Sequence, residues 1–107
     1  MTTSIDAKMA QEAAAWFDNG PNRDALKKAR RTAMRNLGRV AQGAEVIEQV
    51  DIVLQYQAAR GVIDQKLGDL IRRELKRLGA EHGMAGVRSF LAHLVKLHAV
   101  LDLRSRR

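Results

Sequence analysis

Hydrophobic and polar positions recur with a helical period along most of this chain. Between residues 22 and 41, apolar side chains recur three or four positions apart, so at about 100° per residue they form one stripe, with cations on the opposite side. Alanine, leucine, arginine and lysine are abundant and Pro21 is the sole proline, a composition that favours helix over strand. The pattern predicts an all-α fold, a helical bundle of three to four helices in one domain spanning residues 1–107.

Glycine and proline divide this pattern into four predicted helices. Asn19-Gly20-Pro21 ends the first helix, which runs from Ser4 to Asp18, and Asn22 is suited to cap the second. Thr3 followed by Asp6 resembles a capping box at the start of the first helix. The predicted elements are an N-terminal helix within 1–20, a basic helix over 22–41, a long helix over 45–78, a C-terminal helix over 84–103 and a basic tail at 104–107.

The predicted helix over 45–78 is unusually long. At 1.5 Å per residue it would span about 50 Å, and its apolar positions lie near heptad spacing. Helices of this kind often pack between subunits, so we expect a dimer or tetramer formed through it. Gly61 and Gly68 lie seven positions apart on one face, where they either admit another helix closely or are simply tolerated. Gly79 and Gly83 bracket the turn that follows.

The charge of the chain is strongly positive and unevenly distributed. Nineteen Lys and Arg against twelve Asp and Glu give a net charge of +7 and a pI near 10.6. Residues 23–39 hold seven of the cations and a single acid, Asp24. Because a clustered positive surface attracts polyanions, phosphate-rich partners are favoured. DNA leads among them, with RNA as the alternative.

The cations of residues 23–39 are the candidate nucleic-acid-binding side chains. A solvated face whose Lys and Arg stems cover apolar surface is the alternative interpretation. However, like charges four positions apart repel by a few tenths of a kcal/mol, and this segment has almost no acids to pair with them. An unpaired cationic face favours a binding role, helped by a second cluster within 66–77. The candidate residues are Arg23, Lys27, Lys28, Arg30, Arg31, Arg35, Arg39, Arg73, Lys76 and Arg77.

The sequence offers little for catalysis or for metal binding. Cysteine is absent, which excludes disulfides and thiolate ligands. His93 and His98 lie five positions apart and diverge on a helix, unlike the pair four apart of a helical metal site. No phosphate-binding glycine loop and no nucleophile motif occurs. We therefore predict no enzymatic activity, no metal and no cofactor.

Membrane attachment is not favoured by the pattern. No apolar run approaches the roughly 20 residues that span a bilayer, and the amino terminus lacks a basic segment followed by an apolar one. A basic amphipathic helix on a membrane surface is a weaker alternative, because the stripe of residues 26–44 is mostly alanine and has no aromatic anchor. We expect a cytoplasmic protein.

The segment from Asp51 to Leu75 resembles the long second helix of the CsoR/RcnR family of metal-sensing repressors. That helix has an aspartate, a glutamine four positions later, a small residue, an arginine, an acid and paired leucines. Residues 85–97 look like the family's short third helix, and the similarity covers about 28–98. The matching positions are Asp51, Gln55, Ala58, Arg60, Asp64, Leu70, Ile71 and Leu75.

The resemblance implies an all-helical dimer or tetramer that lays basic residues of its first helix across DNA, without a helix-turn-helix. Arg30 and Arg31 fall where the family carries such cations. The family's Cys, His and Cys ligands would fall at Gln49, Glu74 and Leu78, so thiolate coordination is lost. Two functions follow as hypotheses: a DNA-binding transcriptional regulator using the basic amphipathic helix, or a helical assembly or adaptor protein whose apolar stripes bind other chains.

Overall fold

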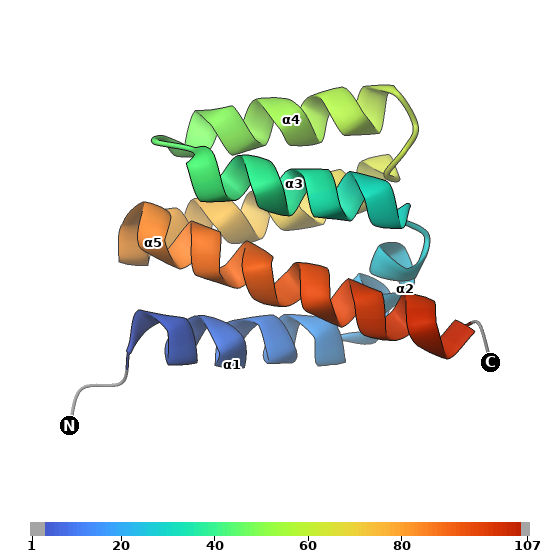
Figure 1. Cartoon of the computed structure of the whole chain (residues 1–107), viewed down its shortest axis with the longest axis horizontal. Helices are drawn as coiled ribbons and strands as arrows, with labels where there is room; N and C mark the ends of the chain where they lie inside the picture. Colours follow the sequence, from blue (N-terminus) through green and yellow to red (C-terminus); the bar gives the residue numbers. More distant parts are fainter. Residues whose placement is uncertain (1–3, 106–107) are drawn as a thin grey trace.

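The computed structural model describes residues 4–105, and within that range every regular element is a helix. The predicted all-α fold is confirmed, but residues 4–105 form five helices rather than three or four. The helices are α1 (Ile5–Asp18), α2 (Gly20–Lys27), α3 (Arg31–Gly43), α4 (Ile47–Ala59) and α5 (Gln65–Ser105). α4, α3 and α1 run in roughly the same direction, with the carboxyl-terminal part of α5 between α3 and α1, and α2 crosses one end of the molecule, seen nearly end-on in Figure 1.

Short polar side chains cap the first two helices. Ser4 is the N-cap of α1, where its hydroxyl accepts from the backbone N–H of Ala7 at 3.1 Å. Thr3 lies outside the described residues. The second cap is Asn19 rather than the predicted Asn22, because the Asn19 carboxamide accepts from the Asn22 N–H at 3.3 Å and α2 already begins at Gly20.

The single basic helix predicted over 22–41 is wrong, because the chain leaves helical geometry at Lys28–Arg30. Local propensity does not cause this break, since these residues are good helix formers. The backbone groups it frees are satisfied from elsewhere: His98 Nε2 lies 2.9 Å from the Ala29 carbonyl oxygen, and the Arg30 N–H donates to Val62 O at 3.4 Å. Partners distant in sequence therefore stabilise the turn.

The long helix predicted over 45–78 is also wrong, because a turn at residues 60–64 separates α4 from α5. Gly61 has φ = 75°, a conformation that favours glycine, so it makes the turn. A Cβ at Gly68 would lie 3.6 Å from Ala58 Cβ of α4, an ordinary van der Waals contact, so the packing there does not require glycine. α4 and the start of α5 thus pack against each other within one chain.

The turn predicted before residue 84 is confirmed at Gly83, whereas Gly79 continues the helix. Gly83 has φ = 68° and ψ = −164°, which interrupts the helical geometry of α5. α5 therefore folds back on itself as a first arm (residues 65–82) and a second arm (residues 84–105), both visible in Figure 1. Residues 106–107 of the predicted tail lie outside the described residues.

The apolar stripes meet in one core within the chain. The stripe over 45–78, expected to face another subunit, is largely buried between α4 and α5. By length and composition alone α5 passes as membrane-spanning, as core helices also do, but Val87, Phe90 and Leu94 are buried among this chain's own helices. The largest fully buried side chains are Met9, Leu26, Met34, Leu37, Leu54, Ile63, Leu67, Ile71, Leu75, Leu78, Phe90 and Leu91.

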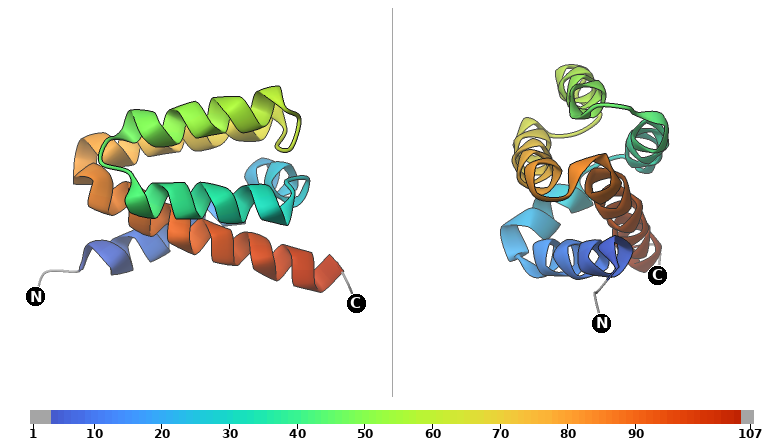
Figure 2. Two further views of the ribbon diagram at one scale, coloured as in Figure 1. Left: turned by 45° about the horizontal axis from the view of Figure 1, so that its top comes forward. Right: turned by 90° about the vertical axis from the view of Figure 1, so that its left-hand side faces the viewer.

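The packing leaves α3 at the edge of the molecule. α3 packs against α4 and α5, and a Cβ at Gly38 would lie 3.0 Å from Val95 Cγ2, so glycine allows α3 to approach the second arm closely. In the right-hand view of Figure 2, α3 and the first arm of α5 lie on opposite sides, with α4 between them at the top. One side of α3 therefore faces away from the protein.

Candidate nucleic-acid interface

The outer side of α3 is polar and cationic along its whole length. Ala33, Met34, Leu37 and Ala41 are buried against α4 and α5, and this fixes which side of the helix faces out. The sequence spacing of three and four residues explains the division, since the apolar stripe and the polar side are out of phase on a helix. The exposed polar side chains are Thr32, Arg35, Asn36, Arg39 and Gln42.

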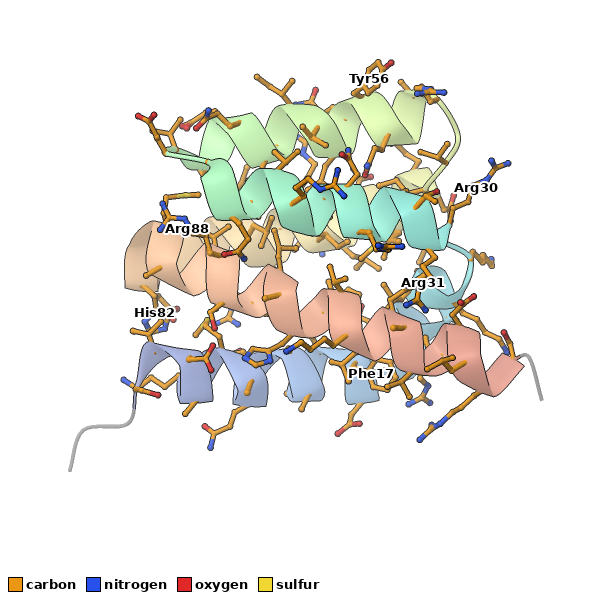
Figure 3. The ribbon with its side chains drawn as sticks, in the orientation of Figure 1. Phe17, Arg30, Arg31, Tyr56, His82 and Arg88 are labelled. Atoms are coloured by element: carbon orange, nitrogen blue, oxygen red, sulfur yellow. The ribbon has the colours of Figure 1, made fainter. Side chains whose placement is uncertain are left out.

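Three candidate cations on this side have no acidic partner. Among residues 4–105, no ion pair reaches Arg30, Arg35 or Arg39, and all three are exposed. Arg31 is different, because its Nη1 lies 3.4 Å from Asp102 Oδ2 on the second arm, and Figure 3 shows its side chain directed toward that arm. The premise of an unneutralised cationic face thus holds for Arg30, Arg35 and Arg39.

Two further cations adjoin this side without having been predicted. Lys96 of the second arm is exposed and lines a hollow of about 180 Å³ together with Arg31 and Arg35. Arg60, after α4, shares a groove with Arg30. Neither residue belongs to a cationic run in the sequence, so only their placement in the fold brings them to α3. We define the α3 surface as Arg30, Arg35, Arg39, Arg60 and Lys96.

The predicted cations of α5 do not belong to the α3 surface. Arg73, Lys76 and Arg77 lie on the first arm, on the side of the molecule opposite α3 (Figure 2). Arg77 is moreover neutralised inside the fold: its Nη2 contacts Glu74 and lies 2.7 Å from Glu12 Oε2, and its Nη1 lies 3.6 Å from Glu81 Oε1. These bonds, from Glu74 first and then Glu12, raise the pKa of Arg77. The two predicted cationic clusters therefore lie on different sides of the molecule.

The α2 cations occupy a third location. Arg23 is half-buried, and its guanidinium lies 5.9 Å from the centre of the Phe17 ring. This cation–π contact joins α2 to α1. Lys27 and Lys28 are exposed at the end of α2, where cations complement the helix dipole. The regular spacing of residues 23–39 therefore does not produce one continuous row, because the turn at 28–30 redirects the chain.

A groove lies between the amino-terminal half of α3 and the carboxyl-terminal half of α4. Its volume is about 290 Å³, and it is lined by Arg30, Asn36, Tyr56, Gln57 and Arg60, among others. The Arg60 guanidinium lies 5.6 Å from the centre of the Tyr56 ring. Figure 3 shows Tyr56 on the outer surface of α4 and Arg30 by the start of α3.

One cluster resembles a hydrolase triad in composition but not in geometry. Ser89 Oγ donates to Asp6 Oδ1 at 2.6 Å, and His93 Nε2 lies 3.2 Å from the same oxygen. A nucleophile needs the histidine between the hydroxyl and the carboxylate, whereas here the carboxylate joins the other two. The Ser89 bond, and then the His93 bond, lower the pKa of Asp6. The cluster holds α1 against the second arm.

His98, Asp51 and Arg72 join separate elements of the fold. Within residues 4–105, no three His, Asp or Glu side chains are grouped to hold a metal ion. His98 is buried and bonded to Ala29 O. Arg72 Nε lies 2.5 Å from Asp51 Oδ1, and this hydrogen bond lowers the pKa of Asp51 while it joins α4 to α5.

The chain matches no protein-family model, no curated protein and no solved structure. Assignment to the CsoR/RcnR family therefore stays a prediction. The segment that carries the resemblance is divided between two helices, with Asp51 and Gln55 on α4 and Leu70, Ile71 and Leu75 on α5.

Proposed function

We propose that this protein binds nucleic acid through the α3 surface and acts as a DNA-binding transcriptional regulator. The observation that carries the proposal is that Arg30, Arg35 and Arg39 are exposed on one side of the molecule without an acidic partner among the described residues. Lys96 and Arg60 extend the positive charge on either side of α3. Such a surface neutralises phosphates and releases counterions.

The dimensions of α3 suit the major groove of DNA. Its 13 residues span about 20 Å, and the groove is about 12 Å wide, enough to admit an α-helix. Arg35 and Arg39 lie one turn apart, with Asn36 beside them, and Arg and Asn are the side chains that pair best with guanine and adenine edges. The cations at either side are suited to the flanking phosphates.

The mode of presentation differs from a helix-turn-helix. In that motif the helix before the recognition helix packs against it. Here, in the part of the chain that the structure describes, α2 packs on α1 and α5 but not on α3. α3 is held instead by α4 and the second arm, with Gly38 allowing the close contact.

The test is the salt dependence of duplex binding. If the five cations of the α3 surface each neutralise one phosphate, log Kobs should fall with log salt with a slope of about −4.5. The double variant Arg35→Gln, Arg39→Gln should reduce the slope to about −2.7 and weaken binding. The matched control is Arg73→Gln, Lys76→Gln, which removes the same charge from exposed positions on the opposite side.

Fluorescence anisotropy with a labelled duplex over a range of salt concentrations measures both slopes. The control should keep the slope of the unmodified protein. Equal slopes for the two double variants would show that net charge alone drives binding, and the assignment to α3 would then fail. Far-UV circular dichroism of each variant verifies that the helices are intact.

An assembly or adaptor function is the second candidate, and the outer side of α4 favours it. Ile52 is 63% exposed and Tyr56 is 60% exposed, one turn apart, while most other apolar side chains are buried inside the chain. Such a pair suits contact with another protein chain or with a second copy. Size-exclusion chromatography with light scattering distinguishes the candidates: an oligomer that ignores duplex DNA and dissociates on Ile52→Ser favours assembly.

A further inference from the structure

The groove between α3 and α4 contains a buried hydrogen-bond acceptor without a donor. Gln57 is 4% exposed, and its Nε2 donates to Ala33 O at 3.0 Å. Its Oε1 has no hydrogen-bond partner, and among the described residues it is the one buried side-chain polar atom in that condition. Buried polar groups are nearly always paired, so an orphaned acceptor on Gln57, a residue that lines the groove, indicates a missing donor.

The groove combines this acceptor with an aromatic ring and two cations. Tyr56 presents a largely exposed ring at the margin, with Arg60 against it at 5.6 Å. Arg30 lies at the same groove, exposed and without an acidic partner among residues 4–105. A nucleotide has all the complementary features. Its base carries an N–H that can donate to Gln57 and a flat face that can stack on Tyr56, and its phosphate is an anion that can bind Arg30 and Arg60.

We propose that this groove binds one unstacked nucleotide. A base N–H donates to Gln57 Oε1, the base stacks on Tyr56, and the phosphate lies between Arg30 and Arg60. Base recognition by hydrogen bonds to the base edge together with stacking on aromatic side chains is a general mode for unpaired bases. The volume of about 290 Å³ is at the small end of ligand pockets, which start at about 300 Å³, and suits a single base.

Two sources supply this chemistry: a free mononucleotide, or one nucleotide of a single strand. The inference rests on the proposed function for its class of ligand. It shares Arg30 and Arg60 with the α3 surface, but Tyr56 and Gln57 belong to the groove alone. Arg35 and Arg39 do not line the groove, and Tyr56 and Gln57, which lie on α4, do not belong to the α3 surface. Failure of the groove and failure of the α3 surface are therefore separable.

The experiment uses the full chain and isothermal titration with AMP, with ribose 5-phosphate as the probe that lacks a base. AMP should bind at least tenfold more tightly than ribose 5-phosphate. Tyr56→Leu and Arg60→Gln should each weaken AMP binding at least tenfold. Ile52→Ala, an equally exposed position on α4, and Arg39→Gln, a cation outside the groove, should leave AMP binding unchanged.

Gln57→Leu adds a test of the orphaned acceptor. It should lower the affinity for AMP toward that for ribose 5-phosphate, while binding of ribose 5-phosphate itself stays unchanged. Because this variant also loses the bond to Ala33 O, its helicity is checked in parallel, and the exposed Tyr56 and Arg60 variants decide the matter if it does not fold.

The proposal is overturned if AMP and ribose 5-phosphate bind equally, if AMP does not bind, or if Tyr56→Leu binds AMP like the unmodified protein. A single-stranded oligonucleotide whose binding is weakened by the same variants, and which AMP displaces, identifies a strand as the source. If the variants weaken the binding of AMP but not that of the oligonucleotide, the free mononucleotide is the source. Loss of AMP binding with an intact effect of Arg35→Gln, Arg39→Gln on duplex binding rejects the groove and retains the α3 surface.

Discussion

Gly83 is the position on which the arrangement of α5 depends, and Gly83→Ala tests it. Its φ of 68° and ψ of −164° fall in a region that is essentially confined to glycine. A Cβ there would meet no atom within 4 Å, so side-chain crowding contributes nothing to the cost. The backbone conformation alone should lower the free energy of unfolding by about 1–3 kcal/mol. For a chain of this size that lowers Tm by roughly 5–20 °C.

The matched control is Gly43→Ala at the end of α3. A Cβ at Gly43 also meets no atom within 4 Å, but its φ is not positive, so alanine should be neutral or stabilise the helix by at most about 1 kcal/mol. Thermal and urea unfolding followed by far-UV circular dichroism measure both variants. Although neither new Cβ meets another atom, the substitution should destabilise the protein at Gly83 and be neutral or stabilising at Gly43.

The sign of the Gly83→Ala effect decides between two forms of α5. A continuous helix of 41 residues would extend about 60 Å, whereas the longest dimension of the molecule is 41 Å. In a continuous helix, glycine is the destabilising residue and alanine would raise Tm. A Gly83→Ala protein as stable as Gly43→Ala, or more stable, would refute the hairpin and the placement of α3 that depends on it.

Two ion pairs give further predictions. Asp51→Asn removes a half-buried charge-assisted bond to Arg72 and should cost about 1 kcal/mol at neutral pH. Because the pKa of Asp51 is lowered in the folded protein, this contribution is present above the unfolded pKa of about 3.9 and is lost as the pH falls through the folded pKa. Urea titrations should therefore show a difference in unfolding free energy between the unmodified protein and Asp51→Asn that disappears at acid pH. A difference that does not change with pH would contradict the role assigned to the Asp51–Arg72 pair. Arg77→Gln should destabilise by less than about 1 kcal/mol, since the side chain is partly exposed, and should not alter duplex binding. A loss of duplex affinity, measured by fluorescence anisotropy, would show that Arg77 belongs to the interface.

Much of the local structure follows directly from residue chemistry. The end of α1 before Gly20-Pro21, the turn at Gly83 and the burial of Leu26, Ala33 and Leu37 agree with the sequence pattern. In each case the determining property is local: proline lacks an N–H, glycine tolerates φ > 0, and apolar residues at helical spacing share one side. Cationic residues on the outer side of α3 follow from the same periodicity.

The tertiary structure decided where the chain turns without a local signal. Lys28, Ala29 and Arg30 favour helix, and they turn because His98 and Val62 supply hydrogen bonds to Ala29 O and the Arg30 N–H. That turn separates α2 from α3 and divides a regular row of cations between two surfaces. Folding likewise neutralises Arg77 and brings Lys96 and Arg60 beside α3. Helical periodicity specifies which residues share a side of a helix, but which sides meet depends on packing and hydrogen bonds between distant segments, and these are set only when the whole chain is folded.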